Sequence, residues 1–209
     1  MNQVNFFLRP KSDGSYRMIL NLKKFNEFVE YHHFKVGTLE TVVKMMKPGC
    51  FMASVDLRDA YYTVPVHPEH RKYLKFLFSG TLYEYTCLPN GLSSAPRIFT
   101  KLLKPVFATL HEQGYLNSGY IDDSYLQGDT PSECYANVDA AVSLFSEWGF
   151  YLYNDKSVFK PTQQPIFLGF QLDSCAMTVS PTIQKVNKTI HTCTTLKNKH
   201  HPSFQMFRK

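Results

Sequence analysis

The stretch Gly119-Tyr-Ile-Asp-Asp-Ser-Tyr-Leu-Gln-Gly128 contains the pattern that decides the fold. Apolar and aromatic residues alternate on both sides of an acidic pair, which predicts a β-hairpin with Asp122 and Asp123 at its tip. Adjacent side chains of a regular strand point to opposite faces, whereas a turn lets neighbouring carboxylates approach one point. Two carboxylates about 4 Å apart repel by roughly 4 kcal/mol at an effective dielectric near 20. The pair is therefore either a solvated turn or a site for a divalent cation.

A third carboxylate follows the apolar run Phe51-Met-Ala-Ser-Val-Asp56. The run predicts a buried strand that delivers Asp56 at its carboxyl end. Mg²⁺ takes oxygen ligands and usually binds through a few carboxylates together with substrate phosphates. Two such ions about 3.5–4 Å apart can stabilise the attacking and leaving oxygens of a phosphoryl displacement. Asp56 therefore favours the cation site over the solvated turn.

Six short stretches of the chain form a series of motifs in a fixed order. They are Phe7–Lys23, Val55–Pro65, Leu88–Phe99, Tyr120–Asp123, Asn154–Lys156 and Leu168–Leu172. In this order they resemble the motifs of the polymerase domain of reverse transcriptases. The resemblance covers nearly the whole chain and is closest to retrotransposons, within them to the tyrosine-recombinase (DIRS-like) group.

Composition is consistent with a folded protein that binds a polyanion. The 209 residues are enough to bury a core as one domain or as two apposed subdomains. A hydrophobic fraction of 44% with 15% aromatic residues excludes a disordered chain. The net charge of +6 favours a polyanionic partner such as nucleic acid.

Cysteine usage and hydropathy indicate the compartment. The five cysteines are odd in number and widely spaced, and no two of them form a Cys-x-x-Cys pair. This disfavours a disulfide framework or a zinc ribbon and indicates a reducing compartment. No apolar stretch approaches 18 residues, and the amino terminus lacks signal-peptide architecture. We therefore expect a soluble intracellular protein, cytoplasmic or nuclear, with no membrane partner.

Helices and hairpins interleave along the chain without a regular strand–helix–strand repeat, which predicts an α+β fold. The predicted strands are 3–9, 16–22, 51–56, 73–78, 81–86, 150–153, 166–172 and 176–180, besides the acidic hairpin. The predicted helices are 38–47, a helix capped by Ser93 or Ser94 that runs to about Glu112 with a kink at Pro105, and 131–148. Residues 183–190 also have helical spacing.

The resemblance implies the right-hand polymerase architecture, with an antiparallel palm sheet backed by helices. It implies fingers in residues 1–32 and 64–94, a palm in residues 33–63 and 95–177, and the start of a thumb or connection in residues 178–209. Most of the thumb is expected to be missing.

The resemblance also implies a catalytic set of Asp56, Asp122, Asp123 and Lys156. Two Mg²⁺ ions, with Mn²⁺ as an alternative, are expected on Asp56, Asp122 and Asp123 together with the Leu57 carbonyl. Lys156 is expected near the triphosphate, where it would stabilise the leaving pyrophosphate.

The expected nucleotide-binding residues are Lys11, Arg17, Asp59, Ala60, Tyr61 and Asn90. Lysine supplies a compact charge and arginine a planar fork that binds phosphate oxygens bidentately. Tyr61 matches the sugar-gate position of the family, where a rigid ring would clash with a 2′-hydroxyl. Asn90 departs from the glutamine of retroviral members. Surface solubilisation, a helix N-cap at Asp59 and a core role for Tyr61 are the simpler alternatives.

Primer and template contacts are expected from Gly91, Arg97, Tyr120, Leu168, Gly169 and Phe170, the last three in the primer-grip hairpin of the family. A zinc site at His32-His33, His67-x-x-His70 or His200-His201 is disfavoured, because no cysteine or carboxylate completes a tetrahedral set at suitable spacing.

Two functions stay open on the sequence. The first is an RNA-directed DNA polymerase (reverse transcriptase) with an RNA or DNA template, a DNA or RNA primer and deoxynucleoside triphosphates as partners. The second is a truncated or non-polymerising nucleic-acid-binding fragment of a retroelement, because residues after about Ser180 look like the beginning of a thumb. A cellular relative ranks lower, since such proteins usually carry Ala-Asp-Asp where this chain has Ile121-Asp-Asp.

Overall fold

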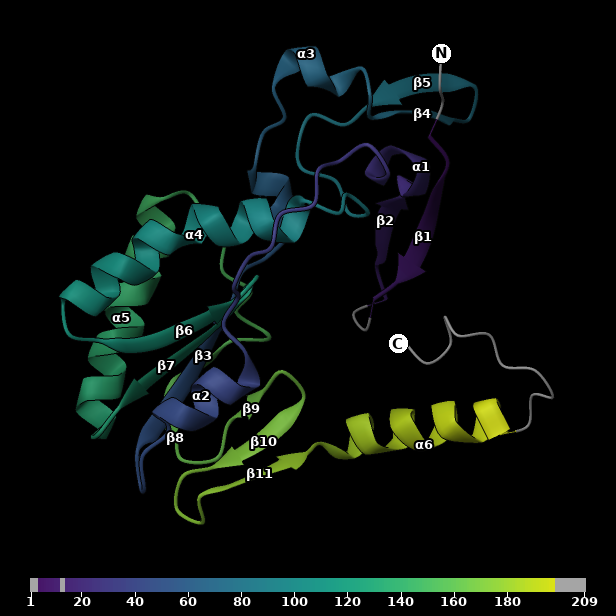
Figure 1. Ribbon diagram of the computed structural model, residues 1–209. Coiled ribbons are helices and arrows are strands. Elements are labelled where there is room, and N and C mark those ends of the chain that lie inside the picture. The colour runs from purple at the N-terminus through teal and green to yellow at the C-terminus, as the bar shows by residue number, and fades with distance from the viewer. Residues whose placement is uncertain (1–3, 12–13, 198–209) are drawn as a thin grey trace.

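The computed structural model of the chain describes residues 4–11 and 14–197 (Figure 1). Its strands are β1 (Phe6–Pro10), β2 (Tyr16–Leu20), β3 (Phe51–Asp56), β4 (Lys75–Phe78), β5 (Thr81–Glu84), β6 (Leu116–Tyr120), β7 (Asp123–Gly128), β8 (Val158–Thr162), β9 (Ile166–Phe167), β10 (Phe170–Asp173) and β11 (Thr178–Pro181). Its helices are α1 (Lys23–Asn26), α2 (Leu39–Met45), the 3₁₀ turn η1 (Ala60–Thr63), α3 (Pro68–Arg71), α4 (Ala95–Glu112), α5 (Pro131–Glu147) and α6 (Ile183–Lys197).

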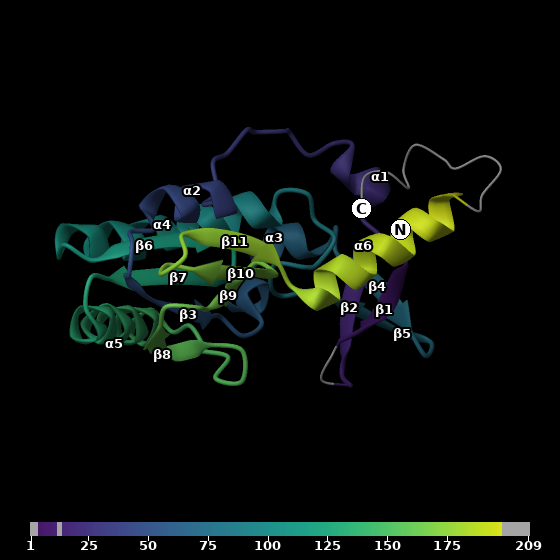
Figure 2. The ribbon, with the colours of Figure 1, turned by 90° about the horizontal axis from the view of Figure 1, so that it is seen from below.

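An antiparallel sheet in the order β6-β7-β3-β8 forms the centre of the molecule. Alternate residues of β3 enter different cores because side chains alternate between the faces of a strand. Ala53 and Val55 pack with residues of α4 and α5, whereas Met52 packs with residues of α2 and β10. Helices α5 and α2 accordingly lie on opposite sides of the sheet (Figure 2). The ends of β3 and β7 are thus held between two packed layers.

A second body is formed by the hairpins β1–β2 and β4–β5 (Figure 1). Their shared core contains Leu20, Leu22 and Leu74. Phe6 and Phe76 meet edge to face with ring centroids 5.6 Å apart, and the Val4 amide donates to the Lys75 carbonyl at 3.0 Å. Aromatic packing of this kind joins the two hairpins although they are about 60 residues apart in sequence.

Helix α6 follows the small sheet β9–β10–β11 and projects from the body of the molecule (Figure 1). It has no buried residue among those described. In its first turn the Lys185 ammonium donates to the Leu168 carbonyl at 3.3 Å and lies 3.5 Å above the Phe170 ring. The Thr182 amide also donates to the Gly169 carbonyl at 3.1 Å. These contacts attach the base of α6 to the β9–β10 turn.

Most of the predicted elements are present near their predicted bounds. The first hairpin, the strand 51–56, the acidic hairpin, the helix to Glu112 and the helix after Pro131 are confirmed. Ser94 occupies the predicted N-cap position of α4, but its side chain makes no capping hydrogen bond. The Ser93 amide instead donates to the Asn26 side chain at 2.9 Å. No helix within residues 4–11 and 14–197 is both long and apolar enough to cross a membrane.

The region after α5 differs from the prediction. Residues 150–153 do not form a strand, because Leu152 makes only an isolated bridge with Leu57 where β3 has already ended. The strand β8 was missed, since Lys160 and Pro161 interrupt its apolar pattern. Proline is tolerated in edge strands, and β8 lies at the edge of the sheet.

Gly128 offers a test of the contact between the sheet and α5. A Cβ atom at this position would collide with the backbone of Cys134 in the first turn of α5. We expect Gly128→Ala to lower the free energy of unfolding by about 3 kcal/mol, because neither backbone can move away without disturbing the core. Urea unfolding monitored by circular dichroism measures this change.

Gly80→Ala is the matched control for Gly128→Ala. Gly80 has a φ of +79° but open space around its Cα, so alanine there strains only the local backbone. Its expected cost is about 1 kcal/mol. Equal costs at the two positions would show that α5 does not pack closely on Gly128.

Candidate active site

The tip of the β6–β7 hairpin is a two-residue turn made by Ile121 and Asp122. Tyr120 and Asp123 pair across the strands directly beside this turn. Asp123 is therefore the first residue of β7, whereas the sequence pattern placed both acids at the tip. Ile121 adopts a φ of +56°, a left-handed conformation that is strained for a β-branched residue. The turn is held in this conformation by the strands that flank it.

Asp56 and Asp123 are cross-strand partners at the ends of β3 and β7. The backbone N–H and C=O of Asp56 point away from β7, toward Ser157 and Tyr153. The Asp56–Asp123 pair is therefore of the non-hydrogen-bonded type, in which Cα atoms lie only about 4.5 Å apart. The Asp122 carbonyl accepts the Leu57 amide at 3.0 Å, which fixes the turn beside the same strand end. Three carboxylates thus gather at one corner of the sheet.

Burial and mutual repulsion raise the pKa of two of these acids. The pKa of Asp123 rises to about 7, first because the group is buried, then through a hydrogen bond with Asp56 and the charge of Asp122. Burial is also the main reason why the pKa of Asp122 is raised, while Arg17 and Lys156 act in the opposite direction. Burial therefore disfavours the ionised forms of both Asp122 and Asp123 at this corner.

A cleft of about 570 Å³ opens over this corner. It lies between the sheet end and the β1–β2 hairpin, which contributes Lys11, Ser15 and Arg17 to the lining. The remaining lining residues are Asp56, Leu57, Arg58, Asp59, Ala60, Tyr61, Tyr62, Asn90, Ile121, Asp122, Tyr153, Asp155 and Lys156. All of the residues predicted to bind the nucleotide meet here, although they come from separate parts of the chain.

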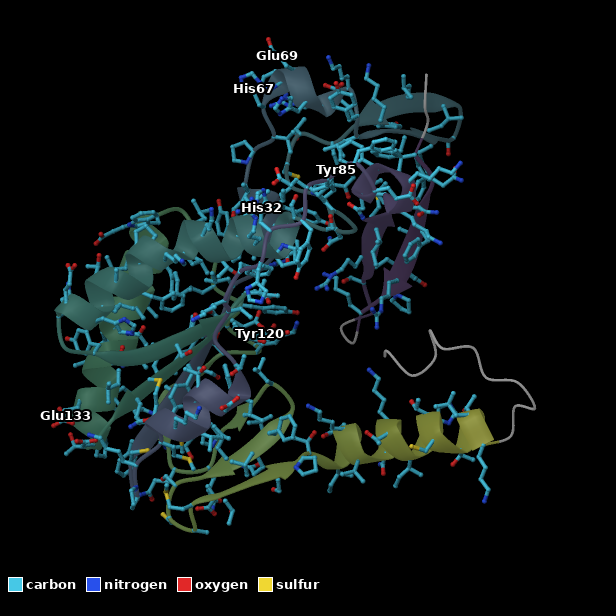
Figure 3. The ribbon with its side chains drawn as sticks, in the orientation of Figure 1. His32, His67, Glu69, Tyr85, Tyr120 and Glu133 are labelled. Carbon is cyan, nitrogen blue, oxygen red and sulfur yellow. The ribbon has the colours of Figure 1, made fainter. Side chains whose placement is uncertain are left out.

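The residues predicted to contact primer and template do not line this cleft. Tyr120 lies at the end of β6 (Figure 3) and packs against the core cluster that contains Met52 and Leu172. Arg97 is half-buried in the first turn of α4. Leu168 and Gly169 form the β9–β10 turn, with φ values of +49° and +75°, and Phe170 begins β10.

Tyr61 and Asn90 form one wall of the cleft. The Tyr61 ring packs edge to face on Phe99 at 5.7 Å, and burial, assisted by the charge of Asp122, raises its pKa to about 12. The ring is therefore rigidly placed and uncharged at neutral pH. The Asn90 side-chain amide donates to the Tyr62 hydroxyl at 2.8 Å. The backbone carbonyl of Asn90 accepts a hydrogen bond from the Leu20 amide at 3.0 Å.

Two neighbouring predictions are refined by the backbone. Asp59 occupies the N-cap position of η1 with a φ of +50°, but its side chain makes no capping hydrogen bond. Gly91 has a φ of +106°, and an added Cβ would collide with the Leu20 carbonyl. A packing requirement between the loop and β2 is therefore sufficient to explain the glycine at position 91.

Sequence reasoning missed three residues of the site. The Tyr153 ring lies under two cations, with the Lys156 ammonium 4.5 Å and the Arg58 guanidinium 5.9 Å from its centroid. The Ser157 hydroxyl accepts the Asp56 amide at 3.0 Å. Arg58 lies inside a quoted motif, and Tyr153 and Ser157 directly flank Asn154–Lys156. Their position next to these motifs was the available signal.

The donor set at the acidic corner suits a hard divalent cation. Among the described residues, no three His, Cys, Asp or Glu side chains are arranged so that they could already hold a metal ion. Mg²⁺, however, usually binds through one or two carboxylates and completes its shell with water and substrate phosphates. Asp56 and Asp122 line the cleft together, and Asp123 pairs with Asp56 across the strands. These residues fit such an ion.

The histidine pairs show a different arrangement. The His67 and His70 rings lie 5.6 Å apart on and beside α3, and His67 is beside the exposed Glu69 (Figure 3). The His32 ring lies 3.4 Å from the Glu30 carboxylate, and both side chains are exposed. His200 and His201 lie outside the described residues.

Comparisons with known proteins agree with this geometry. A family model described as "Reverse transcriptase (RNA-dependent DNA polymerase)" matches residues 9–172. The Pro-Pol polyprotein of feline foamy virus is 27% identical over 194 residues, which cover 90% of this chain and 16% of the polyprotein. That of simian foamy virus type 1 is 26% identical over 167 residues, 78% of this chain and 14% of the polyprotein. The Tf2-3 transposon polyprotein of Schizosaccharomyces pombe is 22% identical over 181 residues, with coverages of 87% and 13%.

Solved structures share the fold. The foamy viral protease-reverse transcriptase dRH in complex with double-stranded DNA has a TM-score of 0.78 at 20% identity, covering 99% of this chain and 34% of that one. The foamy viral protease-reverse transcriptase in complex with an RNA/DNA hybrid has a TM-score of 0.70 at 20% identity, with coverages of 96% and 25%. The predicted α+β class is confirmed.

The raised pKa of Asp123 predicts a pH-dependent gain of stability in Asp123→Asn. Its ordinary value is near 3.8, so the folded state binds the proton more tightly than the unfolded state, and stability falls as the pH rises from about 4 to 7. Asparagine removes this destabilisation. The Tm is measured with a metal chelator in the buffer. At pH 8 we expect the Tm of the variant to exceed that of the wild type by about 2–4 °C for each kcal/mol of destabilisation that the substitution removes. At pH 3.5 we expect the two Tm values to match.

Asp139→Asn is the control for this experiment, because Asp139 is exposed on α5. Its Tm should follow that of the wild type at both pH values. A gain for Asp123→Asn that is the same at pH 3.5 and pH 8 would contradict the electrostatic explanation.

Proposed function

This chain belongs to the reverse transcriptase (RNA-dependent DNA polymerase) family, and from that premise we propose that it catalyses template-directed DNA synthesis. A primer 3′-hydroxyl attacks the α-phosphate of a deoxynucleoside triphosphate, the α–β phosphoanhydride bond breaks, and pyrophosphate leaves. The chain spans between 13% and 16% of the length of the curated relatives it matches. The proposal therefore concerns the reaction of this domain.

One observation carries the proposal: a single cleft has carboxylates at its base and basic residues from separate segments around it. Asp56 and Asp122 line the cleft together with Lys11, Arg17 and Lys156. A nucleoside triphosphate with divalent cations is the kind of ligand that uses both sets of charges, since cations bridge carboxylate and phosphate oxygens. A cleft for an uncharged ligand would not require either set.

We assign the cation ligands to Asp56 and Asp122, with the Leu57 carbonyl as an additional ligand and Asp123 in support. When bound, Mg²⁺ or Mn²⁺ lowers the pKa of the primer hydroxyl and offsets the charge of the phosphates. The protein itself contributes position, because Asp56 ends β3 and the turn that carries Asp122 is bonded to the same strand end through the Leu57 amide.

The basic residues act on the triphosphate in this proposal. Arg17 presents a planar fork to phosphate oxygens, and Lys11 presents a compact charge from the same hairpin. Lys156 approaches from the other side of the cleft, where its ring contact with Tyr153 orients the ammonium. Asp59 and Ala60 place backbone beside the phosphates, and Asn90 would contact the sugar or the template base.

We assign the polymer substrates from the similarity to solved structures and from the positive charge of the chain. The two structural neighbours described above are titled as complexes with double-stranded DNA and with an RNA/DNA hybrid. We propose an RNA or DNA template and a DNA or RNA primer for this chain, held by Gly91, Arg97, Tyr120 and the Leu168–Phe170 turn. In this scheme residues 1–32 and 64–94 are fingers, 33–63 and 95–177 are palm, and 178–209 begin the thumb.

Two narrower assignments are supported by the sequence alone. We propose the DIRS-like group on the motifs quoted above; the relatives identified by comparison are foamy viruses and a fission-yeast transposon. We also propose an intracellular site of action, since all five cysteines are free thiols.

Asp122→Asn tests the catalytic assignment. It keeps the shape of the side chain and removes its charge, so we expect single-nucleotide primer extension to fall by at least about 1000-fold. Binding of a primer–template duplex, measured by fluorescence anisotropy, should change less than about threefold, because Asp122 does not supply the positive charge that binds phosphates.

Asp139→Asn, on the exposed face of α5, is the matched control and should retain full extension. Full retention of extension in Asp122→Asn would overturn the assignment. Duplex binding without extension in the wild type would favour the second function, a nucleic-acid-binding fragment that does not polymerise.

Tyr61 is expected to act as the gate against ribonucleotides. Because its ring is held against Phe99 in the cleft, Tyr61→Val should open space for a 2′-hydroxyl and raise ribonucleotide incorporation relative to deoxynucleotides by about 10–100-fold. Steady-state single-nucleotide extension with both sugars measures the ratio. Tyr61→Phe keeps the ring and should keep the wild-type ratio. An unchanged ratio in Tyr61→Val would remove Tyr61 as the gate.

A further inference from the structure

The outer side of β3 loses its strand partner before the strand reaches Asp56. On that side β8 pairs with β3 only at Met52 and Ser54, with a register shift between the two positions. The backbone N–H and C=O of Asp56 are therefore beyond the ladder. A half-buried N–H without a partner would destabilise this strand end.

A short segment after α5 replaces the missing strand. The Tyr153 amide donates to the Asp56 carbonyl at 2.8 Å. The Asp56 amide donates to the Ser157 hydroxyl at 3.0 Å, and that hydroxyl donates to the Tyr153 carbonyl at 2.9 Å. A hydroxyl can accept and donate at once, so these three bonds close a ring around the backbone of Asp56.

The same segment holds Lys156. The Tyr153 carbonyl also accepts the amides of Lys156, at 3.1 Å, and of Ser157, at 3.0 Å. Lys156 in turn lies over the Tyr153 ring. The Ser157 hydroxyl is therefore the side-chain group through which the turn carrying Lys156 is bonded to the strand end carrying Asp56.

We propose that Ser157 is a positioning residue for the reaction, an inference that rests on the proposed function. Its hydroxyl fixes the backbone of Asp56 beside Asp123 and sets the separation between the carboxylate and the Lys156 ammonium. Alanine would leave the Asp56 amide without its acceptor and the carboxylate free to move away from Asp123. Groups that orient a metal ligand typically change metal affinity or activity by roughly 10–100-fold when removed.

Ser174 provides a matched control at the opposite end of the same strand. Its hydroxyl donates to the carbonyl of Cys50, the residue before β3, at 2.7 Å, and the side chain is buried. Ser174→Ala therefore removes a hydroxyl–backbone bond just before β3, as Ser157→Ala does at the end of β3, together with a longer contact to the Gln163 carbonyl at 3.4 Å. It leaves the ring around Asp56 intact, so any effect common to both variants reports general stability of the sheet.

The experiment compares the wild type, Ser157→Ala, Ser157→Thr and Ser174→Ala by three measurements. Amide hydrogen exchange at Asp56 should accelerate roughly five- to tenfold in Ser157→Ala and in no other variant. The affinity for Mn²⁺, followed by electron paramagnetic resonance, should weaken about tenfold in Ser157→Ala. The rate constant of single-nucleotide addition should fall roughly 10–100-fold while the Kd for the nucleotide changes little, and threonine, which keeps the hydroxyl, should recover most of the rate.

The outcomes separate this proposal from the proposed function. Unchanged Asp56 exchange, Mn²⁺ affinity and rate in Ser157→Ala would overturn the role of Ser157. Equal losses in Ser174→Ala would also overturn it, because they would reduce the effect to sheet stability. If the wild type extends no primer, the polymerase proposal fails, while Asp56 exchange and Mn²⁺ affinity still decide whether Ser157 positions the carboxylate.

Discussion

The close approach of the Asp56 and Asp123 carboxyl groups is the constraint on which the geometry of the site depends. Antiparallel pairing of β3 and β7 sets the two carboxylates opposite each other, and the turn adds Asp122. Helices α4 and α5 on one face, and α2 with β10 on the other, bury the strands so that these ends cannot separate. The fold thus maintains a concentration of negative charge that an isolated hairpin would relieve by fraying.

The compensating positive charge comes from segments distant in sequence. The β1–β2 hairpin supplies Lys11 and Arg17, and the turn before β8 supplies Lys156. Neither segment belongs to the paired part of the sheet that carries the acids. The interior therefore fixes the acids, while Lys11, Arg17 and Lys156 sit on a peripheral hairpin and a turn. Such a division would allow the basic side of the cleft to adjust to a ligand without disturbing the carboxylates.

Local sequence patterns predicted the strands and turns that depend on neighbouring residues. They did not predict the features that depend on contacts between distant segments. The acidic hairpin and the strand ending at Asp56 could be read from alternation and apolar runs. Asp123 was misplaced by one position, because the strain accepted at Ile121 is decided by strand pairing and not by turn preference. The bond between Ser157 and Asp56 could not be predicted from sequence, since the two residues are 101 positions apart. Edge strand β8 was not predicted, because its strand conformation depends on pairing with the distant strand β3.

The attachment of α6 by its first turn means that a rotation there would move the far end of the helix most. The helix has 15 residues, which corresponds to a length of about 22 Å, and Lys185 in its first turn contacts Leu168 and Phe170. A rotation of about 10° at this fulcrum would displace the far end by about 4 Å. Leu168 and Gly169, at the fulcrum itself, would hardly move. Small angular changes at Lys185 are thereby amplified along the helix, while the turn beneath it keeps its place.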